Sequence, residues 1–375
     1  MNKDATQPKA CAGSFVTIFA IAGCAGLQAT ADAAALQFAG APCTSPPALH
    51  CPDRDCPVQT VIDGGPVVEP RTGRQYFLDY PCDLRPGEPV NVILSLHGGG
   101  SFGNWQRHYF PIMDYVDKYR LVIATPNTRA WSPQDDEYLQ NIVSTIIDQL
   151  GRENVRSFWL AGHSMGSFNS RRLVCTDFFK DKVDGYLSLS GGRVGSPPSE
   201  GPARFDIPRQ NDGVATNASR TRPPGPPPGA SGPGGSRSVF VTGQGTLDCD
   251  FSHIYAGGEH EPSAQSLPTT STWAEKYHCE ARQVTRQVVD TRPGYVYDSS
   301  RQQYGTDAWG RQPRPGTAKI MQYPHCDGGR IVADVIRFDK GHTEGLEPHI
   351  TEELVKMMIG VKAGNLSDEV TGVAE

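Results

Sequence analysis

The chain has 375 residues and a formal net charge of −6, which allows one large domain or two small ones and argues against a nucleic-acid surface, since no basic stripe stands out. Only 37% of the residues are hydrophobic, but 41 glycines and 31 prolines dilute that share. Both residue types concentrate in loops, so the composition remains compatible with a sizeable core.

Residues 1–33 have the features of an export leader. Two lysines precede an apolar run, Phe15–Leu27, that is too short to span a bilayer. Two cleavage interpretations stay open. Residues 21–24 (IAGC) resemble a bacterial lipoprotein box, which would leave a lipidated Cys24 as a membrane anchor, whereas residues 31–33 (ADA) fit ordinary signal peptidase cleavage. Either predicts an exported protein that is secreted, periplasmic or anchored at the bacterial cell surface.

The next segment, 34–57, is rich in Pro, Ala and Cys and predicts a loop-rich arm. Alternating strand-type and helix-type segments then predict one catalytic domain over residues 58–362, followed by a C-terminal tail over 363–375. Strands are expected at Arg74–Tyr80 and at Val90–Leu96, where the second is a β-branched apolar run (VNVILSL).

His97 and three glycines follow the second of these strands directly. Glycines let backbone N–H groups approach a negatively charged oxygen, so we expect one oxyanion donor among Gly98, Gly99 and Gly100. A flexible glycine turn is the alternative interpretation.

Further along, Trp105–Tyr119 and Asp135–Leu150 predict helices on either side of a strand at Leu121–Thr125. The second helix carries apolar residues at helical spacing and acids at its N-terminal end, as the helix dipole favours. Side chains near the predicted loops could line a substrate groove or could pack locally; these candidates are His97, Phe102, Trp105, Trp131 and His163.

The most informative motif spans residues 162–166, which read Gly-His-Ser-Met-Gly. A strand at Val155–Ala161 precedes the motif and a helix at Ser167–Cys175 follows it. A sharp turn between strand and helix holds a serine hydroxyl exposed, and it needs glycines because flanking side chains would collide. The pattern predicts Ser164 as a nucleophile and the N–H of Met165 as a second oxyanion donor.

After a strand at Gly185–Ser190, two insertions are expected, at 193–237 and at 283–323. The first is rich in Pro and Gly and indicates a surface loop more than a lid. Between them, Ser238–Thr242 predicts a short strand. Asp248 follows in the loop behind it, and we expect its carboxylate to orient a histidine, with Asp250 as the alternative.

A last strand is predicted at Ile331–Phe338, and His342 follows it near the C-terminus. The order Ser164, Asp248, His342 fits a nucleophile, acid and base. Alternative bases are His253, His325 and His349. In this assignment His342 accepts the proton of Ser164 while the serine attacks a carbonyl carbon, and water later resolves an acyl-enzyme. The chemistry needs no metal and no organic cofactor.

Cysteine usage agrees with export, because removing the leader takes away Cys11 and removes or lipidates Cys24. Of ten cysteines, eight then remain, an even number suited to disulfides in an oxidising compartment. Spacing leaves their connectivity open.

With these motifs placed, residues 75–195 and 238–345 resemble the secreted polyhydroxybutyrate depolymerase and feruloyl esterase family. The resemblance rests on five segments: LHGGG at 96–100, VIATPN at 122–127, DEYL at 136–139, the serine motif, and YPHCDGG at 323–329 with GHT at 341–343. It implies the α/β-hydrolase fold, a doubly wound and mostly parallel sheet with helices on both faces and loop insertions. It also implies a disulfide between Cys279 and Cys326, and hydrolysis of carboxylic esters in feruloylated polysaccharides or polyesters.

Two other functions stay open. The same residues could serve a serine peptidase or an acyltransferase, because these enzymes share the chemistry. A catalytically silent binding protein of the cell surface is a third hypothesis, although all of the catalytic candidates are present.

Overall fold

The computed structural model describes residues 34–38, 41, 43, 66–99, 101, 103–128, 131–194, 247–259, 261–265, 267–289, 317–338, 340–342 and 344–360. All of these except Ala34 belong to one compact unit, Ala35–Glu375. The expected leader, most of the arm, the strand expected at Ser238–Thr242 and the C-terminal tail lie outside the described residues. Among the helices that are described, none has the length and apolar character needed to cross a membrane.

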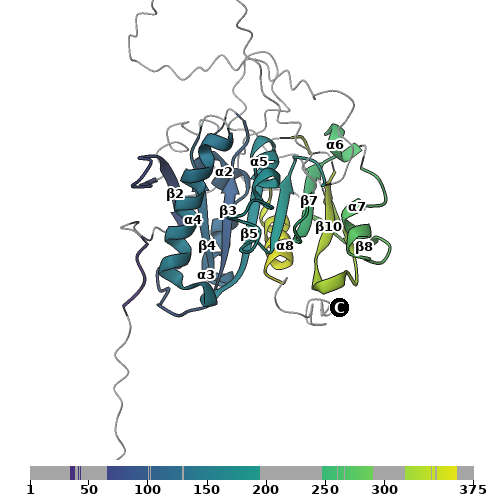
Figure 1. The fold of residues 1–375 in the computed structure, drawn as a ribbon. Coiled ribbons are helices and arrows are strands. Elements are labelled where there is room, and N and C mark those ends of the chain that lie inside the picture. The colour runs from purple at the N-terminus through teal and green to yellow at the C-terminus, as the bar shows by residue number, and fades with distance from the viewer. Residues whose placement is uncertain are drawn as a thin grey trace, which may run out of the picture. The chain divides into compact units, whose positions relative to one another are not determined.

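The described strands form one ten-stranded sheet in the order β1-β2-β4-β3-β5-β6-β7-β10-β9-β8 (Figure 1). Their bounds are β1 Val67–Val68, β2 Gln75–Asp79, β3 Val90–Leu96, β4 Leu121–Pro126, β5 Val155–His163, β6 Gly185–Leu189, β7 Ser252–Gly258, β8 Gln283–Val289, β9 Thr317–Tyr323 and β10 Val332–Arg337. The central strands pair in parallel, in the spatial order β4, β3, β5, β6, β7 and β10. At the outer sides of this group, β2 pairs antiparallel with β4 and β9 pairs antiparallel with β10.

Helices cover both faces of this sheet (Figure 1). They are α2 Gly103–Tyr109, α3 Val116–Tyr119, α4 Asp136–Leu150, α5 Met165–Leu173, α6 Pro262–Gln265, α7 Thr272–Lys276 and α8 Pro348–Ile359. Successive side chains of a strand alternate between the faces. On β3, Val92 and Leu94 therefore join the core beneath α4 and α5, while Ile93 joins the core beneath α2 and α8. A mostly parallel sheet with helices on both faces is the α/β-hydrolase arrangement, so the predicted fold class is confirmed.

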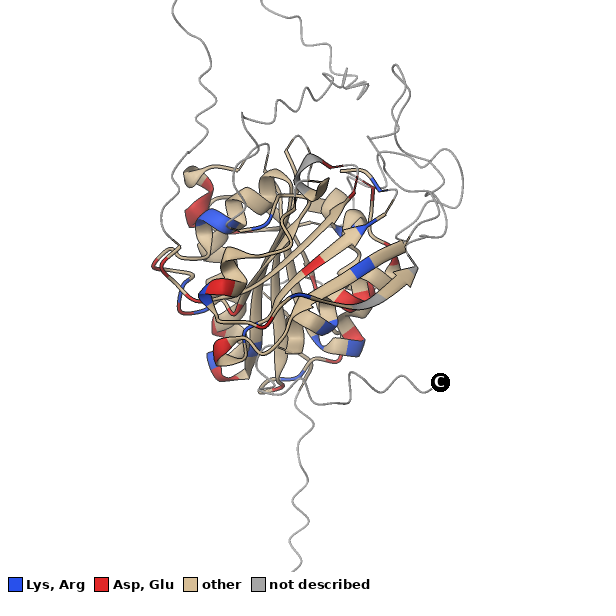
Figure 2. Ribbon diagram, turned by 90° about the vertical axis from the view of Figure 1, so that its right-hand side faces the viewer, with Lys and Arg blue, Asp and Glu red and all other residues tan. Residues whose placement is uncertain are grey.

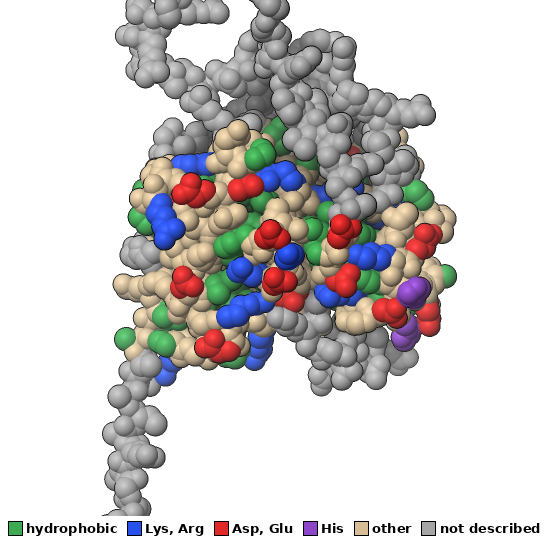
Figure 3. Space-filling view, in the orientation of Figure 1, with side chains coloured by type: hydrophobic (Ala, Val, Ile, Leu, Met, Phe, Trp, Pro, Cys, Tyr) green, Lys and Arg blue, Asp and Glu red, His purple; other side chains and the backbone are tan. Residues whose placement is uncertain are grey.

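Charged side chains are mostly kept out of the sheet. Most of the strand ribbon in Figure 2 is uncharged, and the lysines, arginines and acids gather on helices and loops. On the face seen in Figure 3, cationic and anionic side chains are interspersed among the described residues. This mixed pattern fits the modest net charge of the chain.

Two predicted segments differ from the observed elements. The expected helix at Trp105–Tyr119 consists of α2, a 3₁₀ turn at Ile112–Tyr115 and α3, because Pro111 lacks the N–H that a continuous helix requires at that point. The expected insertion at 283–323 contains β8 and β9, which pair with each other and extend the sheet beyond β10. Its residues 290–316 lie outside the described residues.

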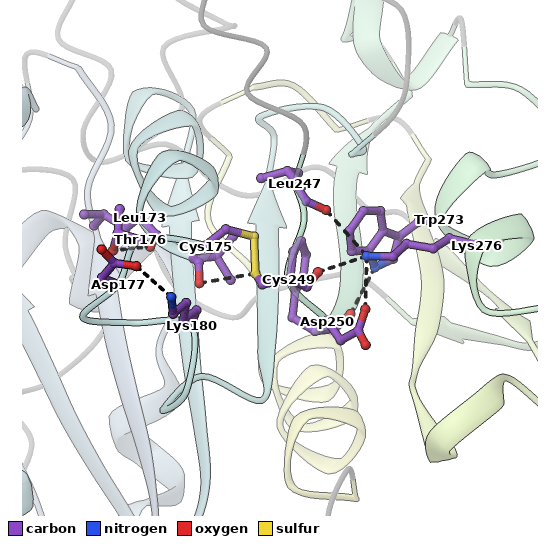
Figure 4. Close-up of a disulfide and its surroundings, with 12 residues drawn as sticks. Leu173, Cys175, Thr176, Asp177, Lys180, Leu247, Cys249, Asp250, Trp273 and Lys276 are labelled. Carbon is purple, nitrogen blue, oxygen red and sulfur yellow. Dashed lines mark hydrogen bonds and ion pairs between the residues drawn. A yellow bond between two sulfur atoms is a disulfide. The ribbon is translucent and has the colours of Figure 1, made fainter.

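Three disulfides join the described cysteines. The bridge expected between Cys279 and Cys326 is confirmed, with an S–S distance of 1.99 Å. The others link Cys43 to Cys82 and Cys175 to Cys249. Figure 4 shows that the last of these ties the segment after α5 to the chain that enters β7.

Candidate active site

Ser164 occupies a tight turn between β5 and α5. Its backbone has φ 50° and ψ −113°, a strained conformation for a residue with a side chain. A Cβ atom at Gly162 would lie 2.3 Å from the backbone of Gly166, and one at Gly166 would lie 2.3 Å from the carbonyl oxygen of Leu96. Both glycines are therefore required for this turn. The N–H of Ser164 donates to the Leu189 carbonyl at 2.9 Å, which fixes the turn to β6.

The loop after β3 lies against this turn. A Cβ atom at Gly99 would stand 3.0 Å from the terminal methyl group of Met165, so the glycine backbone adjoins the residue that follows Ser164. Met165 opens α5, and the first N–H groups of a helix have no acceptor within the helix. The donors expected from Met165 and from the glycine loop thus come from neighbouring segments. Gly100 lies outside the described residues.

His97 is buried and supports this loop from behind. Its Nδ1–H donates to the carbonyl of Gly98 at 2.7 Å, and its Nε2 accepts the N–H of Thr128 at 3.2 Å. Burial lowers the pKa of His97 to about 4, so the ring is neutral and can keep both bonds. The indole of Trp131 donates to the His97 carbonyl at 2.7 Å. These contacts hold the loop in place. The prediction that His97 lines a substrate groove is wrong, because the residue is 0% exposed.

His342 lies in the loop after β10, with a buried carboxylate beside it. Its Nδ1 is 3.5 Å from Oε2 of Glu261. The other oxygen of Glu261, Oε1, accepts the N–H of Gly258 at 2.9 Å and the hydroxyl of Ser190 at 2.7 Å. Oε2 makes no hydrogen bond within the described residues. The carboxylate is therefore held through one oxygen and presents the other to His342.

The expectation that Asp248 orients the histidine has to be corrected. Asp248 is exposed and precedes β7, at the amino end of that strand. Glu261 follows the carboxyl end of β7 and is 3% exposed. Asp250, the alternative, is also exposed and pairs with Lys276 at 3.1 Å. Glu261 stands three residues after Gly258, just as Asp248 stands three residues after Gly245, so the local sequence does not separate the two acids.

His163 is the residue before the serine, and its ring is buried among other rings. The ring centroids of Tyr109 and Trp105 lie 4.2 and 5.1 Å away, and that of His342 lies 4.9 Å away. Trp105 is itself 4% exposed and stacks on Tyr109. The expected lining role is therefore wrong for His163 and Trp105, which pack inside the core. Trp131 is half-buried, and Phe102 lies outside the described residues.

The other candidate bases lie elsewhere. His253 is buried in β7, where its Nε2 accepts the N–H of Val194 and its Nδ1 faces the Tyr186 carbonyl. His325 and His349 are exposed. Within the described part of the chain, no group of three or more His, Cys, Asp and Glu side chains is arranged to hold a metal ion.

No protein-family model and no curated protein sequence matches this chain. Solved structures do match it, and three of them share between 11 and 18% of aligned residues with this chain. An acetyl xylan esterase from Aspergillus awamori is 11% identical, with 76% of this chain and 94% of that chain covered and a TM-score of 0.42. An alpha-beta serine hydrolase homologue from Coxiella burnetii is 13% identical, over 49% and 68%, with a TM-score of 0.29. FphF, a fluorophosphonate-binding serine hydrolase of Staphylococcus aureus, is 18% identical, over 31% and 51%, with a TM-score of 0.27, so the match spans about half of that enzyme.

Proposed function

We propose that this protein is an exported serine hydrolase that cleaves carboxylic esters with Ser164, His342 and Glu261. The observation that carries the proposal is the buried Glu261 carboxylate, 3.5 Å from Nδ1 of a histidine that lies against the serine turn. Separations of this size are common before substrate binds, and such contacts tighten in the reacting complex. Glu261 replaces Asp248 in the predicted set, while the nucleophile and the base stay as predicted.

The proposed reaction consists of the formation and the hydrolysis of one acyl-enzyme, and His342 accepts and returns a proton in each half. His342 accepts the proton of Ser164 through Nε2 while the serine oxygen attacks the ester carbonyl carbon. Glu261 accepts the Nδ1–H of His342, fixes its tautomer and stabilises the imidazolium. The N–H of Met165 and an N–H of the Gly98–Gly100 loop bind the oxyanion, each contributing about 3–4 kcal/mol to lowering the barrier. The alcohol leaves with the proton, and water attacks the acyl-enzyme by the same route.

A glutamate can do this work because its surroundings restrict it. Gly258 and Ser190 fix Oε1, so the longer side chain cannot turn away from His342. Burial removes the water that would otherwise screen the carboxylate from the imidazolium. Support for the acid role therefore comes from the burial of Glu261 and its position after the carboxyl end of β7, whereas Asp248 is exposed and precedes that strand.

Two exposed apolar side chains beside the nucleophile support an ester with a large apolar group. Met165 is 40% exposed and Phe168 is 52% exposed, and they lie one turn apart at the start of α5. A surface helix normally presents polar residues to water, and exposed apolar side chains next to a reactive group favour an apolar ligand. Feruloyl or other aryl esters of the plant cell wall and polyester chains, the substrates of the resembled family, meet this requirement.

Export is supported by the disulfides. Three bridges join residues that are 39, 74 and 47 positions apart in the sequence. Such bridges persist in oxidising compartments. The proposal therefore includes secretion or anchoring through a lipidated Cys24, which mass spectrometry of the mature N-terminus would distinguish.

The test is labelling by a fluorophosphonate probe, followed by turnover of p-nitrophenyl butyrate, methyl ferulate and a p-nitroanilide amide. We expect the wild type to label and to cleave both esters. Ser164→Ala should lose labelling and at least about 10⁴-fold in kcat. Ser170→Ala, on the same helix with its hydroxyl on the Ala161 carbonyl, is the matched control and should label normally. Labelling of Ser164→Ala would refute the nucleophile. Faster amide than ester cleavage would favour a peptidase, and a folded wild type without labelling would favour a silent binding protein.

A further inference from the structure

We propose that His163 is a positioning residue that holds the backbone of His342 and so keeps the base in register with Ser164. This inference rests on the proposed function. It assigns a role to a side chain of the serine motif that contacts the histidine loop directly, and it requires no contact between His163 and substrate.

The contact is a hydrogen bond between two segments far apart in the sequence. Nε2 of His163 is 2.9 Å from the carbonyl oxygen of His342. A carbonyl only accepts, so Nε2 carries the proton. His163 ends β5 and directly precedes Ser164. One peptide bond therefore links the anchor of the base to the nucleophile, and a change in this contact alters the distance between the two.

The charge state of His163 suits this role. The ring is buried, and burial lowers its pKa well below 6.5, with the nearby His342 as the next cause. His163 thus stays neutral when His342 receives a proton, and it adds no positive charge beside the imidazolium. A lysine or arginine at this position would donate the same hydrogen bond but would repel the protonated base.

The second nitrogen of the ring argues against a purely packing role. Nδ1 is buried and has no hydrogen-bond partner within the described residues. A Cβ atom at Gly98 would lie 2.5 Å from it, so the missing side chain of Gly98 leaves room for this atom. Leaving a buried acceptor unpaired costs folding stability. An apolar ring would fill the same space without that cost, but it could not donate to His342.

The rest of the histidine loop is fixed independently. Lys340 and Glu344 form a buried ion pair at 3.0 Å that brackets His342, and Arg337 donates to the Glu344 carbonyl at 2.8 Å. These contacts hold the ends of the loop. The hydrogen bond from His163 is made to the backbone carbonyl of His342, the proposed base. Its loss should therefore displace His342 without unfolding the loop.

The test compares His163→Leu with His163→Gln, because a glutamine amide can donate from nearly the same place as Nε2. Turnover of p-nitrophenyl butyrate is divided by the number of active sites, which is titrated with the fluorophosphonate. We expect His163→Leu to lower kcat per active site by about 10- to 100-fold, the effect of a small misplacement of a catalytic group, with KM changed less than about threefold. His163→Gln should recover most of the loss. His253→Gln, a buried neutral histidine on β7 with other partners, is the matched control and should leave kcat per active site unchanged.

Two results would overturn the inference. In the first, His163→Leu turns over at the wild-type rate per active site. In the second, His163→Gln is as slow as His163→Leu, which would assign the effect to ring packing. A wild type that fails to react with the probe would instead overturn the proposed function, and the inference with it. A purely structural residue would lower the number of active sites and leave the rate of each one intact.

Discussion

The two ends of β7 carry acidic residues with opposite surroundings. At the amino end, Asp248 and Asp250 are exposed on either side of Cys249, which is bridged to Cys175 (Figure 4). Asp250 meets the ammonium group of Lys276, which also lies near the surface. At the carboxyl end, Glu261 is buried, bonded to Ser190, and faces His342.

The direction of the strand, more than the kind of acid, decides which carboxylate can lie beside His342. Parallel strands bring their carboxyl ends to one edge of the sheet, where Ser164 and His342 also lie. The seven residues of β7 separate the two ends by about 20 Å. An acid that precedes the strand therefore cannot reach a histidine beyond its far end, however well the order along the sequence fits.

The largest expected effect comes from the acid at the carboxyl end. Glu261→Gln keeps the size of the side chain but removes the charge that, in the proposed mechanism, orients and stabilises the protonated His342. We expect kcat to fall by about 10³- to 10⁴-fold. Asp248→Asn, at the amino end, should stay within about twofold of wild type. Ester kinetics on both variants checks this, and the reverse ranking would restore Asp248 as the acid.

A smaller but still large effect is expected from a glycine at the carboxyl ends of the parallel strands, compared with one at their amino ends. A Cβ atom at Gly258 would lie 2.1 Å from the Lys340 carbonyl, so Gly258→Ala should separate the acid from the histidine loop and lower kcat by about 10- to 100-fold. At the amino edge, a Cβ atom at Gly185 would lie 2.4 Å from the Trp159 ring. Gly185→Ala should lower the free energy of unfolding but leave kcat per active site unchanged. Equal losses of kcat in both variants would contradict the expectation that only the carboxyl ends of the strands affect turnover.

The disulfide at the amino end should matter for stability alone. Replacing Cys175 and Cys249 by serine removes a crosslink that spans 74 residues, and we expect the free energy of unfolding to fall by about 2–4 kcal/mol. Urea unfolding measures the loss, while ester turnover of the folded protein should be nearly unchanged. A selective loss of kcat would mean that the two ends of β7 are coupled.

The smallest effect is expected for the ion pair between Asp250 and Lys276. Their side chains are 60% and 33% exposed, so water and salt screen the attraction. Asp250→Asn should change the free energy of unfolding by less than about 1 kcal/mol and should not alter turnover. A large drop in kcat would reinstate Asp250 as the alternative acid.

Local patterns predicted the parts of the fold that lie next to strong sequence signals. The bounds of β3 were predicted from its β-branched run, and the turn around Ser164 from its glycines. β7 (SHIYAGG) was missed because it begins with two polar residues and ends with two glycines. Its polar side chains are nevertheless buried, since the Ser252 hydroxyl accepts the N–H of Ile331 and His253 accepts that of Val194. Partners on distant segments make this possible, and no local pattern contains them.

Glu261 was missed as a consequence. The rule that an acid follows its strand by a short loop was applied to Ser238–Thr242, which lies outside the described residues, and it selected Asp248. The same rule applied to β7 selects Glu261, three residues after Gly258. The roles expected for His97, Trp105 and His163 failed for a related reason, because exposure depends on neighbouring segments that the sequence does not place.

The chain on either side of residues 195–246 is anchored by contacts among described residues. Val194 is bound through its N–H to His253, and Cys249 is crosslinked to Cys175, so both anchors belong to the sheet or to α5 and its C-terminal turn. The cost of closing a longer or shorter connection grows only slowly with its length. Evolution can therefore lengthen, shorten or exchange this stretch without re-setting Ser164, Glu261 and His342, and an engineer can use the same junctions to graft a new substrate-recognition segment.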